Sequence, residues 1–210
     1  AKPVVLVEDL SYPGFRRAAE LLRADVVAVP MDDHGLIPEA LDDIARRHDA
    51  QLLCTSPEVH NPTTRATPLA RRQAIAAVAR RRGFAILEDD CYRIGARAAE
   101  SYRALLPDQG WLVTSISKSI TPALRIGFVV APERARADLL RVAEHGFFGL
   151  AQPLADLAAD VLNDPALPGV LAEVRAEYMH YIQTAVNGLG GYDLQWRRDV
   201  PFLWLTLPAG

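Results

Sequence analysis

The sequence has little cysteine, no long hydrophobic run and no excess of basic residues. Its two cysteines, Cys54 and Cys91, are too few for a disulfide framework and predict a reducing, cytoplasmic environment. No stretch reaches the ~18 apolar residues needed to cross a membrane, so no membrane partner is expected. Lys and Arg number 23 against 26 Asp and Glu, which argues against a nucleic-acid-binding surface. The five histidines show no zinc-ligand spacing, so no metal site is predicted.

Half of the 210 residues are hydrophobic, and apolar runs alternate with helix-patterned segments from the N-terminus onward. The pattern predicts helices at 14–24, 38–48 and 69–82, and strands at 4–8, 25–31, 51–56, 84–90, 111–117 and 125–130. This alternation is typical of an α/β fold with a mostly parallel sheet sandwiched by helices. Only a short link precedes the strand at 125–130, and a parallel crossover needs a dozen or more residues, so that strand is predicted to be antiparallel.

The pattern changes at Glu133, where long helices are predicted at 133–145, 153–164 and 167–190, followed by strands at 192–198 and 201–208. We place a domain boundary near Gly149–Pro153. Residues 1–149 then form a large domain that lacks its N-terminal part, and residues 150–210 begin an incomplete α+β small domain. Phe147 and Phe148, beside the boundary, are expected to pack at an interface or in the core.

Polar side chains follow the strands of the predicted sheet, and the carboxyl ends of parallel strands share one edge, where ligands bind. The antiparallel strand returns an arginine to the same edge. The set comprises a lysine, carboxylates, an amide, tyrosines, serines and that arginine. Serines and a bidentate arginine suit a phosphate, a lysine beside cations suits a Schiff base, and a buried carboxylate suits a protonated ring nitrogen. Together they predict a site for pyridoxal 5'-phosphate.

Four motifs stand in order after successive strands: "EDLSYPGF" from Glu8, "NPT" from Asn61, "EDDCY" from Glu88, and "SISK" followed by "LRIGF" from Ser115. In these motifs the chain resembles the fold-type I pyridoxal phosphate enzymes of the class I/II aminotransferase superfamily. Three longer stretches, "VEDLSYPGF" from Val7, "PMDDHGLIPEAL" from Pro30 and "LARRQAIAAVARRRGFAILEDDCY" from Leu69, resemble most the aminotransferase-like domain of MocR-type GntR family transcriptional regulators. Those proteins join a winged-helix DNA-binding domain to this fold.

The resemblance implies a role for each site residue. Lys118 would carry the cofactor as a Schiff base and move the substrate proton, and Asp89 would pair with the ring nitrogen. Tyr92 and Asn61 would hydrogen-bond the phenolic oxygen, and Tyr12 would stack on the ring. The phosphate would be held by Ser115, Ser117 and Arg125. An amino acid or amine would be the small-molecule partner, the full-length parent would be a homodimer, and DNA would be contacted only through a domain outside this chain.

Most of these residues have a plainer structural alternative. Lys118 could be a strand-end side chain that reaches water, and Tyr12 could be core packing. Asn61 could hold the turn before Pro62, and Ser115 could merely alternate along its strand.

The neighbouring motif residues are expected to have structural roles. Asp90 is expected to cap the segment that follows it. His60 is expected at the surface of its loop, and Cys91 is expected to be a small buried residue.

The sequence also departs from the family pattern. Thr64 stands where the family usually has glycine, which leaves the backbone geometry of that turn open. The family's phosphate-binding loop and its substrate-carboxylate arginine have no counterpart in these residues. We therefore expect the isolated chain to bind the cofactor weakly or not at all, and not to transaminate.

Three functions follow from the sequence. The favoured hypothesis is a cofactor-binding effector and dimerisation domain of a GntR/MocR-type regulator. The alternatives are part of a free-standing aminotransferase, and a chain that keeps the fold without cofactor function.

Overall fold

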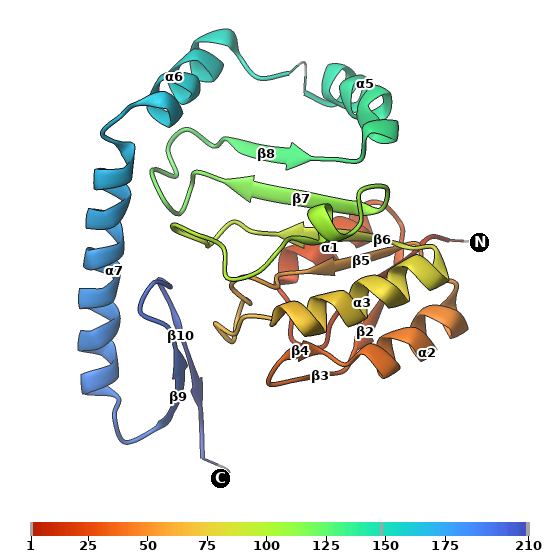
Figure 1. The fold of residues 1–210 in the computed structure, drawn as a ribbon, viewed down its shortest axis with the longest axis horizontal. Helices are drawn as coiled ribbons and strands as arrows, with labels where there is room; N and C mark the ends of the chain where they lie inside the picture. The colour runs from red at the N-terminus through yellow and green to blue at the C-terminus, as the bar shows by residue number, and fades with distance from the viewer. Residues whose placement is uncertain (1, 148, 209–210) are drawn as a thin grey trace.

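A computed structural model describes residues 2–147 and 149–208, and within them six strands form one sheet in the order β2-β1-β5-β6-β7-β8 (Figure 1). Their bounds are β1 (Val4–Glu8), β2 (Asp25–Val29), β5 (Leu52–Thr55), β6 (Ala85–Asp89), β7 (Gly110–Ser115) and β8 (Gly127–Val130). The first five strands are parallel, whereas β8 runs antiparallel to β7 and pairs Gly127 with Ser115. The short link after β7 leaves no room for a crossover, which is why β8 turns back as predicted.

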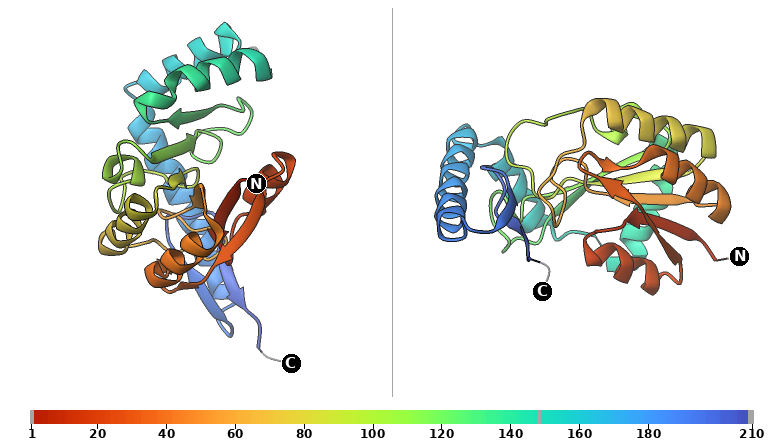
Figure 2. Two further views of the ribbon diagram at one scale, coloured as in Figure 1. Left: turned by 90° about the vertical axis from the view of Figure 1, so that its right-hand side faces the viewer. Right: turned by 90° about the horizontal axis from the view of Figure 1, so that it is seen from below.

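Helices cover both faces of the sheet, which confirms the predicted α/β architecture (Figure 2). One face carries α2 (Pro38–His48), α3 (Leu69–Arg82) and α4 (Tyr102–Leu105), and the other carries α1 (Pro13–Leu21). Proline in the first turn starts α1 and α2, because its fixed φ suits that position. Gly83, with φ of 81°, ends α3 in a left-handed cap.

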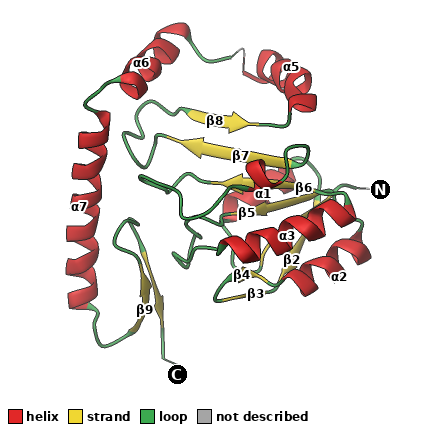
Figure 3. Ribbon diagram, viewed as in Figure 1, coloured by secondary structure: helices red, strands yellow, loops and turns green. Residues whose placement is uncertain are grey.

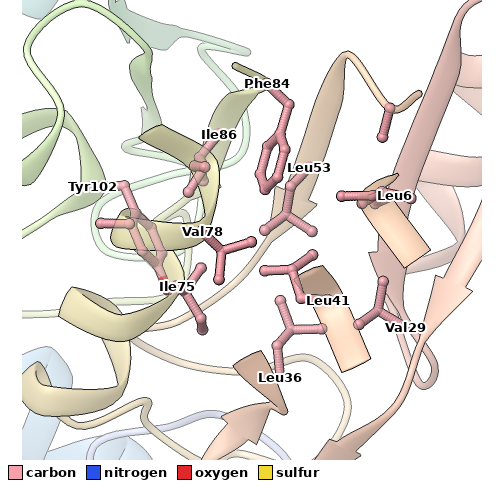
Figure 4. Packing of buried hydrophobic residues seen from close by; sticks show 14 of the residues in the cluster. Leu6, Val29, Leu36, Leu41, Leu53, Ile75, Val78, Phe84, Ile86 and Tyr102 are labelled. Carbon is pink, nitrogen blue, oxygen red and sulfur yellow. The ribbon is translucent and has the colours of Figure 1, made fainter. Parts of the chain in front are cut away.

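The largest buried cluster lies between the sheet and the α2–α3 layer (Figure 4). Leu6, Leu53 and Ile86 point from the three central strands toward Leu41 and Val78 on the helices. Burying each such side chain contributes roughly 1.5–3 kcal/mol. This packing holds the central strands rigidly, and thereby fixes where their carboxyl ends stand.

Two short features of this region were not predicted from the sequence: the hairpin β3 (Met31–Asp32) with β4 (Gly35–Leu36), and the helix α4. Elements of two to four residues carry no periodic signal. The hairpin depends instead on Asp32, which accepts a hydrogen bond from the His34 amide at 2.7 Å and two from the Arg71 guanidinium.

The C-terminal part contains η1 (Glu133–Ala135), α5 (Arg136–Phe147), α6 (Gln152–Asn163), α7 (Leu167–Gly188) and the hairpin of β9 (Asp193–Trp196) with β10 (Leu203–Thr206). The long helix α7 and this hairpin stand beyond the carboxyl ends of the parallel strands (Figure 3). The expected packing of Phe147 and Phe148 concerns side chains outside the described part of the chain. Among the described helices, none combines the length and the apolarity that a membrane span requires.

Apolar side chains are exposed along β8, α5 and α6. They are Val129, Val130, Leu140, Val142, Leu154, Leu157 and Leu162, each at least 37% exposed. So many exposed aliphatic side chains on neighbouring elements are typical of a surface that another piece of protein covers.

Candidate functional site

A cavity of about 330 Å³ opens at the carboxyl ends of the strands. Its lining combines one amine, one guanidinium, a carboxylate, two phenols, two hydroxyls and a thiol: Lys118, Arg125, Asp89, Tyr12, Tyr92, Ser115, Ser117 and Cys91. The structure thus brings together every residue predicted for the site except Asn61. That residue lies next to the cavity, where its side-chain amide is 3.5 Å from the Tyr92 hydroxyl.

Lys118 lies on the turn that leaves β7, with its side-chain nitrogen 5.4 Å from the centre of the Tyr92 ring. At that distance the ring face attracts an ammonium group. The Tyr92 ring is in turn held edge-on by Phe202, with 5.0 Å between centroids. Lys118 is thus an exposed residue that lines the cavity, with its amine over an aromatic ring that is itself contacted from the C-terminal hairpin.

Hydroxyl groups form the wall between β7 and β8. The Ser115 and Ser117 hydroxyls are 2.9 Å apart, the Ser117 amide donates to Ser115 Oγ at 3.1 Å, and Ser115 Oγ is 2.9 Å from the Ile126 carbonyl. Ser115 is therefore oriented by its neighbours, in addition to alternating along its strand. Arg125 stands beside them with φ of 52°, a left-handed backbone that an arginine adopts at a cost.

Asp89, at the end of β6, supplies the carboxylate. Its Oδ1 accepts a hydrogen bond from the Cys91 amide at 3.0 Å. Burial raises the pKa of Asp89 despite the hydrogen bonds from Cys91, and the nearby charge of Glu8 adds to this. A carboxylate with a raised pKa inside a cavity is prepared for a positively charged partner, which would restore its ionised form.

Tyr12 reaches the cavity because Gly14 has no side chain. A Cβ on Gly14 would come within 2.2 Å of the Tyr12 ring. The ring also contacts Phe15 edge-on, with 5.9 Å between centroids. Tyr12 is 43% exposed and lines the cavity, which does not fit the alternative that it is core packing.

The prediction that Asp90 caps the following segment is wrong. Asp90 is buried and accepts hydrogen bonds from Arg93 at 2.8 Å and Arg97 at 3.1 Å, and no helix starts behind it. Arg97 also pairs with Glu88 at 2.9 Å. Burial raises the pKa of Glu88 and of Asp90, and the arginines oppose that effect. This ion-pair cluster supports the loop that carries Tyr92.

The prediction that His60 lies at the surface is also wrong, since only 4% of it is exposed. The backbone geometry at Thr64, the position where the family usually has glycine, is also clear. Thr64 has φ of 64°, so it keeps the left-handed conformation that favours glycine. Its amide donates to the His60 carbonyl at 2.7 Å, so the turn is closed without glycine.

Three contributors were missed by the sequence reasoning: Gly14, Cys91 as a lining residue, and the buried pair of Glu8 and His60. Gly14 stands in the "YPG" stretch, where a glycine two residues after a site tyrosine is a signal that could have been used. Cys91 is half-buried rather than buried, although burial and Asp89 raise the pKa of its thiol. Among residues 2–147 and 149–208, no group of three or more His, Cys, Asp or Glu side chains could hold a metal ion.

Comparison with known proteins shows which family this chain belongs to and which proteins it resembles. The family described as "Aminotransferase class I and II" matches residues 1–202. The 2-aminoadipate transaminase of Thermus thermophilus is 29% identical over 98% of the chain and 55% of its own length. The HTH-type transcriptional regulator YdeF of Bacillus subtilis is 23% identical over 97% of the chain and 44% of its own length. The chain thus spans about half the length of such relatives.

A solved structure agrees with the fold. The α-aminoadipate aminotransferase LysN from Thermus thermophilus, complexed with N-(5'-phosphopyridoxyl)-L-leucine, matches all of this chain and 57% of its own, with a TM-score of 0.88 and 26% identity.

A further HTH-type regulator, TauR of Rhodobacter capsulatus, is 39% identical over 60% of the chain and 26% of its own length.

Proposed function

Because the chain belongs to the class I and II aminotransferase family, we propose that it is the pyridoxal phosphate-binding, aminotransferase-like domain of a GntR/MocR-type transcriptional regulator. One observation carries the cofactor assignment: the cavity gathers an amine, a buried carboxylate, hydroxyls and a guanidinium around about 330 Å³. That donor set fits the aldehyde, the ring nitrogen and the phosphate of the cofactor.

Each residue at the cavity would have a separate role in cofactor binding. Lys118 would bind the cofactor covalently and, once released from it, would hold or return a proton at its side-chain nitrogen. Asp89 would face the ring nitrogen, Tyr12 would cover the ring, and Tyr92 with Asn61 would orient the phenolic oxygen. When bound, pyridoxal phosphate supplies an electron sink for bonds at the α-carbon of an amino compound.

The phosphate would lie against Ser115, Ser117 and Arg125. Hydrogen bonds from a guanidinium to a phosphate are charge-assisted and are roughly twice as strong as neutral ones. Since Ser115 is already fixed by Ser117 and by the Ile126 carbonyl, this hydroxyl is oriented before the ligand arrives.

A borohydride trap tests the cofactor assignment. The full-length protein is incubated with pyridoxal phosphate, reduced and digested, and the modified peptide is located by mass. We expect labelling confined to Lys118, with the Lys118→Ala variant unlabelled. Absence of label in the full-length protein, or equal label on Lys2, would contradict the assignment.

The regulator assignment is supported by HTH-type regulators that match nearly the whole chain. The partners would be an amino acid or amine, a second copy of the full-length protein, and DNA through a domain outside this chain. The place of action would be the cytoplasm. A DNA-binding assay on the full-length protein, with and without pyridoxal phosphate, tests this: a cofactor-dependent change in affinity is expected.

A free-standing aminotransferase is the second candidate, favoured by the match of the whole chain to the α-aminoadipate enzyme. Turnover of amino acids by the full-length protein, together with no DNA binding, would select this alternative.

A further inference from the structure

A buried histidine and a buried carboxylate meet where the order of the sheet reverses. The chain passes from β1 to β2 on one side of β1, and β5 then adds on the other side. Glu8 is the last residue of β1, and His60 lies five residues after β5. Both side chains are at most 5% exposed, and His60 Nε2 is 3.5 Å from Glu8 Oε2.

The histidine joins two loops. Its Nε2 is 2.9 Å from the Leu10 carbonyl, and its Nδ1 is 2.6 Å from the Thr63 hydroxyl. Because a carbonyl only accepts, Nε2 carries the proton, and in the neutral ring Nδ1 accepts from Thr63. One imidazole thus ties the loop after β1 to the loop after β5.

The carboxylate is held on one side only. Its Oε1 accepts hydrogen bonds from the Thr55 hydroxyl and from the Ser56 amide at 3.3 Å. Its Oε2 is buried and has no hydrogen-bond partner among the described residues, although it faces His60. A buried carboxylate oxygen without a hydrogen bond is costly, so its retention at this position needs an explanation.

The two tied loops carry site residues on either side of the cavity. The loop after β1 leads from Leu10 to Tyr12, and the loop after β5 places Asn61 directly after His60. Glu8 also lies near Asp89, whose raised pKa is due chiefly to burial and in smaller part to the Glu8 charge. The pair therefore lies close to the chain segments that carry Tyr12, Asn61 and Asp89, although neither Glu8 nor His60 lines the cavity.

We propose that Glu8 and His60 are positioning residues, which couple the loop that carries Tyr12 to the loop that carries Asn61 so that both take their places together. The inference rests on the proposed function, because it assigns the coupling to cofactor binding. Neither residue touches the reacting atoms.

Hydrogen exchange of the cofactor-free, full-length protein tests the coupling. In the His60→Leu variant we expect the amides of residues 9–12 and those of Asn61, Thr63 and Thr64 to exchange about tenfold faster together, since a factor of ten corresponds to the loss of about one buried hydrogen bond. His60→Gln, which keeps a donor and an acceptor, should restore part of the protection. Glu8→Gln, which keeps the volume, should loosen both loops as well and stands in if His60→Leu does not fold.

Glu58→Gln is the matched control. Glu58 is as deeply buried as Glu8 and lies on the same loop after β5, but its carboxylate pairs with Arg72 at 2.8 Å and with the Ala98 amide. We expect this variant to lower the thermal midpoint while it leaves residues 9–12 as protected as in the wild type.

Titration with pyridoxal phosphate, followed by its absorbance, gives the second readout. We expect the Kd to rise about tenfold in His60→Leu and Glu8→Gln, and to change less than twofold in Glu58→Gln. Faster exchange of only one loop, or an unchanged Kd with a wild-type spectrum, overturns the inference. A wild-type protein that binds no pyridoxal phosphate while its loops stay coupled overturns the proposed function instead.

Discussion

Arg125 combines backbone strain with a role in the proposed phosphate site. Its φ of 52° is disfavoured for any residue with a Cβ, and its side chain is exposed and lines the cavity. Strain that persists at a ligand site is consistent with selection for binding rather than for stability.

We expect Arg125→Gly to raise the stability of the cofactor-free protein by up to about 1 kcal/mol and to weaken pyridoxal phosphate binding roughly 10- to 100-fold. Arg23→Gly is the control, because Arg23 is exposed with φ of 56° away from the cavity. It should show the gain in thermal midpoint with no change in cofactor Kd. Equal cofactor affinity in the two variants would remove Arg125 from the phosphate site.

Asp89 predicts a pH dependence. Since its pKa in the folded chain is raised above 3.8, folding favours the protonated form. Its stabilising contribution is complete below the unfolded pKa and is lost as the pH rises through the folded one. Without cofactor, Asp89→Asn should therefore become progressively more stable than the wild type as the pH rises above about 4.

Thermal melts across that pH range measure this difference. Asp9→Asn is the control, because Asp9 is exposed near the same edge of the sheet. A stability difference for Asp89→Asn that stays flat with pH would mean that the carboxyl group is not desolvated by folding. The same variant should also bind pyridoxal phosphate more weakly, because it removes the carboxylate proposed to pair with the ring nitrogen.

Seven of the eight site residues named from the sequence line one cavity because strand ends converge in a parallel sheet, and that rule needs only the strands and their order. His60 could not be placed in this way. Its burial depends on the Leu10 carbonyl, fifty residues earlier, and no local pattern encodes that contact. Asp90 was misassigned for a similar reason, since its partners Arg93 and Arg97 lie on an irregular loop.

At the scale of elements, the C-terminal helix and hairpin hold the loops of the site. The Tyr178 hydroxyl of α7 donates to the Lys118 carbonyl at 2.7 Å, and Arg197, just after β9, donates to the Glu58 carbonyl at 2.7 Å. Phe202 adds its contact with the Tyr92 ring. Three loops that carry or flank site residues are thus each contacted from beyond residue 166.

We expect Arg197→Met to release the hairpin, because it leaves the buried Glu58 residue with an unpaired carbonyl, at a cost of about 1–3 kcal/mol. Hydrogen exchange over residues 193–206 should become faster. Arg198→Met, a substitution at the exposed neighbour, should leave that exchange unchanged. Equal effects in both variants would show that charge rather than the specific hydrogen bond holds the hairpin.

The periodic elements were predictable, and the short ones were not. The helices at 38–48 and 69–82 have the bounds that their sequence patterns predict, because Pro38 starts the first helix and Pro68 and Gly83 flank the second. The hairpin of β3 and β4 depends on Asp32 and Arg71, which lie thirty-nine residues apart in the chain. Tertiary contacts of that kind decide structure where periodicity is absent.

At the scale of the whole molecule, the exposed aliphatic surface of β8, α5 and α6 is expected to be buried against another protein surface. We expect the full-length protein to sediment as a dimer at micromolar concentration, and Leu140→Glu, at a residue 57% exposed, to weaken that dimer if the surface lies at the subunit interface. Glu39→Gln, on α2 away from this surface, is the control. A monomer at every concentration would contradict the proposed homodimer.

The reversal of β8 has a consequence for how such a site is gained or lost over generations. Because β8 turns straight back, Ser117, Lys118 and Arg125 lie within nine consecutive residues, so the proposed covalent attachment site and the proposed phosphate ligands are encoded by one short stretch of gene. A small deletion there would remove both at once and leave the sheet, whose strands lie outside it, able to form. A lineage could therefore discard the cofactor in a single event while keeping the scaffold for other uses.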